Sequence, residues 1–187
     1  MAKRILLLAS GGGSLAAAIL QAHDAGLINA EFVGLVSDKA SPALDIARQF
    51  RLPDFYLPMQ SDRTAWDQAI FECTEALAPD LIVSVGFMRI LAARFINTFK
   101  VINTHPSLLP LFPGAHAVRD ALAAGVTTTG TTVHWVDAGL DTGPVISQRE
   151  VEVLPGDNEA TLHERIKIAE RALIVETLAG YGKTGTL

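Results

Sequence analysis

Residues 4–14, RILLLASGGGS, decide how this chain begins to fold. An apolar run of strand length is followed directly by three glycines between two serines. Such a run, without polar alternation, is typical of a strand buried on both faces of a parallel sheet. The alanine- and leucine-rich segment over residues 15–25 then predicts a helix, with Gly26 where a C-terminal glycine would lie. The stretch therefore predicts strand, tight turn and helix, which is the first unit of an α/β fold.

The same alternation continues through the first half of the chain. We expect strands over residues 31–37, 54–57, 81–85 and 101–104, and helices over residues 42–50, 63–77 and 92–99. Asp62 is in position to cap the second of these helices. Short apolar strands separated by helices predict a mainly parallel sheet covered on both faces, a Rossmann-like three-layer α/β fold.

The last third of the sequence has a different pattern. After a helix over residues 116–124, two β-rich runs at 131–136 and 145–153 predict a hairpin-like region. Asn158 or Asp157 can cap a long helix that we expect to end at about residue 178. Residues 180–187 are small and polar, and we expect a poorly ordered tail. No repeat or linker divides the chain, so we expect a single domain over residues 1–187.

Composition limits the functions to consider. A formal charge of −5 disfavours a general nucleic-acid binder, which would carry a basic face. Cys73 is the only cysteine, so the chain contains neither a disulfide framework nor a multi-cysteine metal site. The N-terminus superficially resembles a secretory signal, but residues 10–14 interrupt its apolar run, and no run is long enough to span a bilayer. We therefore expect a cytoplasmic protein without membrane or nucleic-acid partners.

The strongest chemical signal is the pair Asn103 and His105. They lie two residues apart on an expected strand, so both side chains face the same side, and Pro106 favours an extended backbone at His105. An amide donor beside an imidazole can stabilise an oxyanion while a proton moves. Asp141 could orient or charge that imidazole. Alternatively, its Asp-Thr-Gly-Pro sequence is ordinary turn chemistry.

Other polar residues leave two interpretations open. The glycine loop at residues 10–14 can cradle a phosphate at a helix N-terminus or simply form a turn, and it matches neither a Walker loop nor the dinucleotide fingerprint. His134 lies on an expected strand and faces either the interior or a cleft. Lys167 and Glu170 are neighbours on the last helix, where a surface ion pair is the simplest interpretation. Arg89 follows a buried strand, where α/β folds hold ligand contacts.

Taken together, these segments resemble the phosphoribosylglycinamide (GAR) formyltransferases of purine biosynthesis. The resemblance covers most of the chain up to about residue 178. The Asn-x-His-Pro-Ser-Leu-Leu-Pro segment at 103–110, followed by Asp141, is its most specific element. The other matching segments are ASGGGS at 9–14, GFMRIL at 86–91, GTTVH at 130–134 and LDTGP at 140–144.

The resemblance implies a reaction and a set of catalytic residues. The primary amine of GAR would attack the formyl carbon of 10-formyltetrahydrofolate, the co-substrate, and tetrahydrofolate would leave. Asn103 and His105 would stabilise the oxyanion, His105 would also donate a proton, and Asp141 would assist proton transfer. No metal is implied. Residues 1–100 would form a phosphate-binding half, and residues 101–179 a catalytic and folate-binding half.

The resemblance also implies substrate contacts. The GAR site would comprise Gly13, Ser14, Leu15, Lys167 and Glu170. The formyl-folate site would comprise Arg63, Met88, Arg89, Ile90, Leu91, Asn103, Asp137, Ala138, Gly139, Leu140 and Asp141. Many members have Asn where this chain has Leu15, which can offer phosphate only its backbone amide. The oligomeric state stays open, with a homodimer as one alternative.

Several rival functions are weighed against this interpretation. A methionyl-tRNA formyltransferase, a formyltetrahydrofolate deformylase or a sugar-nucleotide formyltransferase would use the same machinery in a longer chain. A non-catalytic nucleotide-binding module would explain the glycine loop but not Asn103, His105 and Asp141. Such a module should be stabilised by nucleotides and not by folates.

Overall fold

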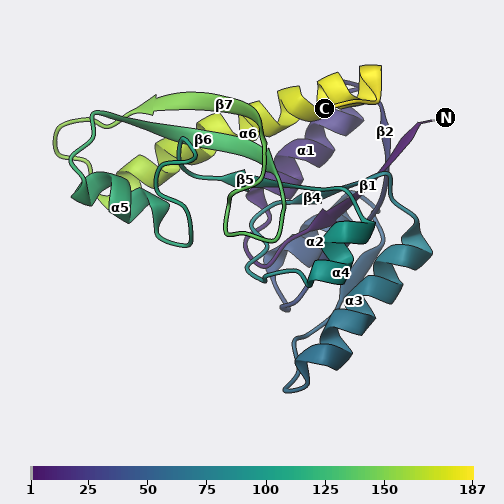
Figure 1. The fold of residues 1–187 in the computed structure, drawn as a ribbon. Coiled ribbons are helices and arrows are strands. Elements are labelled where there is room, and N and C mark those ends of the chain that lie inside the picture. Colours follow the sequence, from purple (N-terminus) through teal and green to yellow (C-terminus); the bar gives the residue numbers. More distant parts are fainter. Residues whose placement is uncertain (1) are drawn as a thin grey trace.

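The computed structural model describes residues 2–187, whose strands form one seven-stranded sheet in the order β3-β2-β1-β4-β5-β6-β7 (Figure 1). The strands are β1 (Lys3–Leu8), β2 (Ala30–Ser37), β3 (Asp54–Tyr56), β4 (Leu81–Ser84), β5 (Val101–His105), β6 (Thr128–Trp135) and β7 (Val145–Glu152). The first five run parallel, while β6 and β7 pair antiparallel. The predicted Rossmann-like α/β fold with a hairpin-like end is confirmed.

The helices cover both faces of this sheet. They are α1 (Ser14–Asp24), α2 (Pro42–Gln49), α3 (Arg63–Leu77), α4 (Ala93–Thr98), α5 (Ala117–Ala123) and α6 (Glu159–Thr184). As predicted, Asp62 caps α3, accepting from the Ala65 amide at 3.0 Å, and Asn158 caps α6 within a capping box. None of the helices within residues 2–187 combines the length and apolar character needed to cross a bilayer.

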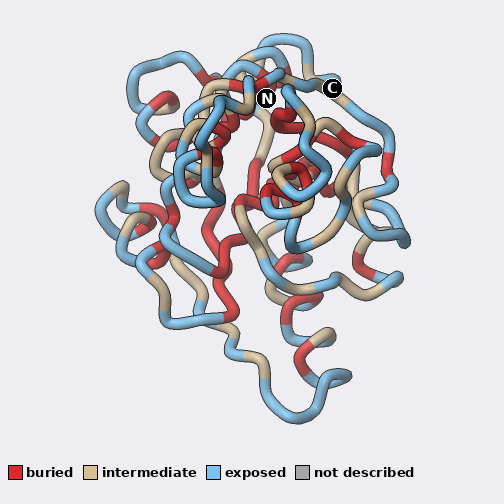
Figure 2. Tube along the Cα trace, turned by 90° about the vertical axis from the view of Figure 1, so that its left-hand side faces the viewer, coloured by how far each residue is buried: buried red, intermediate tan, exposed pale blue. Residues whose placement is uncertain are grey.

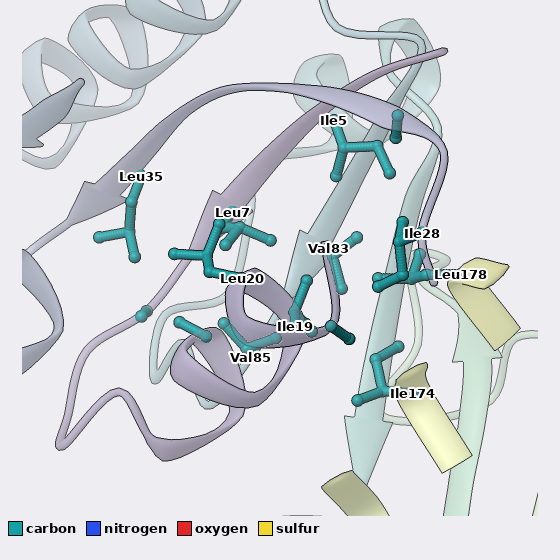
Figure 3. Close-up of a cluster of buried hydrophobic side chains, with 14 of the residues drawn as sticks. Ile5, Leu7, Ile19, Leu20, Ile28, Leu35, Val83, Val85, Ile174 and Leu178 are labelled. Carbon is teal, nitrogen blue, oxygen red and sulfur yellow. The ribbon is translucent and has the colours of Figure 1, made fainter. Parts of the chain in front are cut away.

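Side-chain alternation along β1 builds two separate cores. Ile5 and Leu7 pack with α1 and α6 on one face, as the labelled side chains in Figure 3 show. Leu6 and Leu8 point to the other face, where they join Trp66 of α3 in a second cluster. All four β1 side chains are completely buried. Because both faces are covered, β1 must be apolar from Ile5 to Leu8, which explains the apolar run near the start of the sequence.

Polar side chains of these buried parallel strands therefore lie at the strand ends. Leu8 of β1 is in register with Ser84 of β4, which is in register with Asn103 of β5. The carboxyl ends of these three parallel strands consequently meet at one edge of the sheet. Figure 2 shows the buried residues concentrated in the interior of the molecule and the exposed residues at its periphery. This edge is where open α/β sheets bind ligands.

The C-terminal segment differs from its prediction. Instead of ending at about residue 178 before a poorly ordered tail, α6 continues to Thr184 and ends at Gly185, whose φ is 73°. Tyr181 is buried, and the backbone of Gly182 lies against Asn29. The prediction failed because glycine content weakens a helix locally, whereas contact with a segment distant in sequence holds this one.

Two glycines of this last stretch provide a matched test. A Cβ at Gly182 would lie 2.8 Å from the Asn29 carbonyl oxygen, whereas one at Gly180 would meet nothing within 4 Å. We expect Gly180→Ala to raise the free energy of unfolding by about 0.5 kcal/mol through helix propensity. Gly182→Ala should lower it by about 1–3 kcal/mol through overpacking. Urea unfolding of both variants measures this, and equal effects would mean that α6 does not pack on Asn29.

Candidate active site

Strand β5 carries the central side chains of the site. Asn103 lies opposite His134 of β6 in the antiparallel ladder, and His105 lies opposite Thr132. Directly opposed residues of an antiparallel pair share a face, and so do residues two apart on one strand. Asn103 and His105 therefore lie on one face, as predicted, and His134 joins them there.

The imidazole of His105 is buried and held at both nitrogens. Its Nε2 lies 2.8 Å from the Phe112 carbonyl oxygen, and its Nδ1 lies 3.4 Å from Oδ2 of Asp141. A carbonyl oxygen can only accept, so Nε2 carries a hydrogen and donates it. The contact between Nδ1 and Oδ2 is then favourable only when a second proton lies between them. The Asp141 carboxylate thus lies beside the one ring nitrogen of His105 that the Phe112 carbonyl oxygen does not occupy.

Asp141 lies between two histidines. Its Oδ1 is 3.6 Å from Nε2 of His134, while its Oδ2 contacts His105 and accepts from the Gly114 amide at 2.8 Å. The backbone of Asp141 is left-handed, with φ at 55°, a conformation that Asp tolerates better than most residues. The Asp-Thr-Gly-Pro turn therefore directs this carboxylate into the site, so turn and functional roles coincide.

His134 holds Asn103. Burial lowers the pKa of His134, so the ring is neutral near pH 7. Its Nδ1 donates to the Trp135 carbonyl oxygen at 2.9 Å, which leaves Nε2 to accept from the Asn103 amide at 3.3 Å. One amide hydrogen of Asn103 is thereby fixed and the other remains for a ligand. The sequence alone did not decide between a structural and a functional role for His134, because that role depends on how β6 pairs with β5.

The proline-rich loop after β5 is anchored to β6. Thr132 donates its hydroxyl hydrogen to the Ser107 carbonyl oxygen at 2.6 Å and accepts from the Leu109 amide at 3.0 Å. Ser107 in turn donates to the carbonyl oxygen of Leu111. These bonds fix the Phe112 carbonyl oxygen that holds His105, so the loop is part of the site.

The glycine loop presents backbone amides to solvent at the start of α1. Gly13 is the N-cap in the left-handed conformation, with φ at 74°, and no side chain caps the helix. A Cβ at Gly13 would lie 2.8 Å from the Cα of Ala43, so only glycine fits. Ser14 is exposed, while Leu15 turns its side chain onto the core and keeps its amide at the helix end. Such an N-terminus suits an anion.

A buried network that the sequence did not reveal joins this loop to two other strand ends. Ser10 donates its hydroxyl hydrogen to Asp38, directly after β2, and accepts from the Met88 amide at 2.8 Å. The fully buried Asp38 carboxylate also pairs with the guanidinium of Arg89. The Arg89 side chain, expected at a folate contact, is thus bound within the protein. Charges that lie far apart in sequence gave no local signal of this pairing.

The remaining residues expected at a folate site lie on two loops and on α3. Arg63 donates to the Ile90 carbonyl oxygen at 2.5 Å and also pairs with Asp67. Asp137 accepts from the Gly139 amide and the Thr142 hydroxyl, which shapes the second loop. Large apolar side chains stand exposed on both loops: Met88, Ile90 and Leu140. Leu91 is half-buried and Ala138 is exposed.

Helix α6, which packs against α1, carries the last two expected residues. The predicted surface ion pair between them is wrong: Lys167 pairs with Glu164 at 2.7 Å, and Glu170 is buried. Burial raises the pKa of the Glu170 carboxyl. Helical geometry allows either partner for Lys167, and packing of Glu170 against the sheet decides between them.

Comparison with known proteins agrees with this geometry. Residues 3–178 match the family model described as "Formyl transferase". The chain is 49% identical to a phosphoribosylglycinamide formyltransferase of Mycobacterium tuberculosis, over 97% of this chain and 86% of that protein. It is 36% identical to the Bacillus subtilis protein of the same name, over 98% of each.

Solved structures agree as well. The glycinamide ribonucleotide transformylase 1 of Symbiobacterium toebii superimposes with a TM-score of 0.93 at 36% identity, over 97% of this chain and 88% of that one. The resemblance noted in the sequence is therefore confirmed over most of the chain. The chain belongs to the formyl transferase family.

Proposed function

We propose that this protein transfers the formyl group of 10-formyltetrahydrofolate to the primary amine of 5′-phosphoribosylglycinamide, in de novo purine biosynthesis. The products are the N-formyl compound and tetrahydrofolate. The observation that carries the proposal is the Asp141 carboxylate between His105 and His134, beside the amide of Asn103. An amide donor and a proton-holding pair are the groups that formyl transfer to an amine requires.

In the proposed mechanism, the amine attacks the formyl carbon and negative charge develops on the formyl oxygen. The free amide hydrogen of Asn103 and the His105 imidazolium stabilise this charge, because both are fixed before the reaction begins. His105 gives its Nδ1 proton toward the leaving folate nitrogen. Asp141 contacts Nδ1 of His105. Its carboxylate receives the proton lost by the attacking amine and passes it to His105, which returns to its starting state.

The proposed GAR site combines the glycine loop with α6. The free amides of Gly13, Ser14 and Leu15 bind the phosphate at the N-terminus of α1. Leu15 contributes no side-chain hydrogen bond, so the backbone carries the recognition. Lys167 and Glu170 contact the same substrate from α6.

The proposed folate site spans the two loops that carry exposed apolar side chains. The flat pterin ring packs against Met88, Ile90 and Leu140, which are otherwise in contact with water. Main-chain groups of Arg89, Leu91, Ala138 and Gly139 bind its polar edge, beside Asn103, Asp137 and Asp141. Arg63 lies toward the acidic tail, where its guanidinium can exchange Asp67 for a carboxylate of the folate.

The proposal extends to the setting of the protein. Its lone cysteine, Cys73, needs no oxidising compartment, so we place the enzyme in the cytoplasm. The proposed mechanism uses no metal ion, and no group of three or more His, Cys, Asp or Glu side chains among residues 2–187 is arranged so that it could hold one. The homodimer remains a proposal, for which sedimentation at several protein concentrations is the direct measurement.

A formyl-transfer assay tests the proposed function. Purified protein is mixed with 10-formyltetrahydrofolate, with and without GAR, and the release of tetrahydrofolate is followed. We expect release only when GAR is present, and chelators should not reduce it. Release without any acceptor would identify a hydrolase instead. Binding of folate without release in either mixture would require another amine acceptor.

Truncation of the oxyanion donors tests their roles. Asn103→Ala and His105→Ala should each lower kcat by about 10²–10³-fold, because each removes a fixed donor to the oxyanion. Asn97→Ala, which changes an exposed residue of α4, is the matched control and should retain full activity. Near-normal turnover in either site variant, with an unchanged Tm, would remove that residue from the mechanism.

Asp141→Asn separates proton handling from binding. The variant keeps a side chain of the same shape but loses the charge that holds the proton on His105. We expect kcat to fall by about 10²-fold while the KM for GAR changes little. Asp45→Asn, an exposed change on α2, serves as the control. A raised KM with normal kcat would contradict the assigned role.

A further inference from the structure

The loop at residues 106–114 holds a strained backbone position at Phe112. Its φ is 53°, in the left-handed region that bulky side chains rarely adopt. Phe112 also precedes Pro113, and a residue before proline favours an extended backbone. Two preferences of the sequence therefore oppose the conformation that this residue has in the structure.

Helix ends explain two of the four left-handed non-glycine residues within residues 2–187. Arg51 follows the C-terminus of α2 and Ala78 ends α3, and a left-handed residue is ordinary where a helix ends. The other two, Phe112 and Asp141, end no helix and lie in the candidate active site. Strained backbone concentrates at functional sites, where the surrounding structure holds it in place.

The Phe112 side chain does not account for the strain. Its residue is half-buried, and the ring belongs to none of the three apolar clusters formed within residues 2–187. The conformation instead directs the main chain, because the Phe112 carbonyl oxygen lies 2.8 Å from Nε2 of His105. Ser107, which is completely buried, lies behind this oxygen with its hydroxyl at 3.3 Å. The strained residue thus presents a fixed acceptor to the histidine.

The same turn also holds the partner of His105. Gly114, two residues after Phe112, donates its amide hydrogen to Oδ2 of Asp141 at 2.8 Å. That oxygen is the one that lies 3.4 Å from Nδ1 of His105. A carbonyl oxygen and an amide hydrogen from one three-residue segment therefore hold both members of the pair. A change in the backbone at Phe112 would move the two contacts together.

We propose that Phe112 is a positioning residue, whose left-handed backbone keeps a hydrogen on Nε2 of His105 and leaves Nδ1 toward Asp141. The inference rests on the proposed function, because the proposed mechanism passes its proton through Nδ1. The carbonyl oxygen accepts the hydrogen on Nε2, so the neutral ring has one preferred tautomer. Without that acceptor, the Asp141 carboxylate would draw the hydrogen to Nδ1 instead.

Two substitutions separate the backbone conformation from the aromatic ring. Phe112→Val and Phe112→Asn both remove the ring, but Asn tolerates the left-handed region and β-branched Val does not. We expect Phe112→Val to lower kcat by about 10²-fold, the order that a small misplacement of a catalytic group costs, with little change in the KM for GAR. Phe112→Asn should restore most of the lost turnover.

Arg51→Val is the matched control. It places the same β-branched side chain at an exposed left-handed position, with φ at 56°, at the end of α2. We expect it to lower the Tm as Phe112→Val does and to leave kcat unchanged. Phe112→Ala replaces Phe112→Val if the valine variant does not fold, because alanine also disfavours this backbone. A loss of kcat in Arg51→Val as large as in Phe112→Val would overturn the inference.

The tautomer of His105 can be observed directly. Two-bond ¹H–¹⁵N correlation spectra of the neutral ring show which nitrogen carries the hydrogen, and His105→Ala identifies the signals. We expect the hydrogen on Nε2 in the unaltered protein and in Phe112→Asn, and a shift toward Nδ1 in Phe112→Val. An unshifted tautomer in Phe112→Val, or equal losses of kcat in the valine and asparagine variants, would overturn the inference.

The spectra require neither substrate, so they separate this inference from the function on which it rests. If the tautomer stays unshifted while the unaltered protein formylates GAR, the positioning role is wrong and the proposed function stands. If the tautomer shifts as expected but the unaltered protein never formylates GAR, Phe112 still fixes His105 and the proposed function is overturned.

Discussion

The constraint on which the rest of this structure depends is that its central strands are buried on both faces. Strand β1 has helices above and below it, and its side chains from Ile5 to Leu8 are completely buried. A polar side chain in the middle of such a strand would lose its hydration without a partner. Polar groups are therefore confined to the strand ends. Because the strands are parallel, their carboxyl ends lie together at one edge of the sheet. The candidate active site forms at this edge, beyond the buried apolar side chains.

Strand β5 relaxes this constraint. Its partner β6 is antiparallel, and at its end both faces carry polar side chains. On one face Asn103 and His105 meet His134 and Asp141, with hydrogen bonds that fix which atoms carry hydrogens. On the other face Thr104 is buried without a hydrogen-bond partner in residues 2–187, and Glu170 of α6 is buried as well. The two sets are packed differently. The first is held by the loops at residues 106–114 and 137–143, and the second by a helix that packs along the sheet.

The buried ion pair of Asp38 and Arg89 serves a different purpose. It joins the glycine loop to the loop after β4 through Ser10, which accepts from Met88. A buried carboxylate is stable only when it is paired, so any displacement of one loop is resisted by the other. The proposed phosphate site and the proposed folate site are thus built on one rigid connection. This arrangement fits a reaction in which two substrates must meet at a fixed distance.

The sequence by itself determined the features that depend on neighbouring residues. The apolar runs and their spacing predicted the parallel sheet, Asp62 and Asn158 predicted helix starts, and the two-residue spacing predicted the shared face of Asn103 and His105. Contacts between distant segments were decided only by the tertiary structure. Cross-strand register brought His134 to Asn103, packing on Asn29 extended α6 through Gly182, and burial separated Glu170 from Lys167. Local propensity is a property of a few adjacent residues, whereas these contacts arise only when the sheet has formed and its helices cover it.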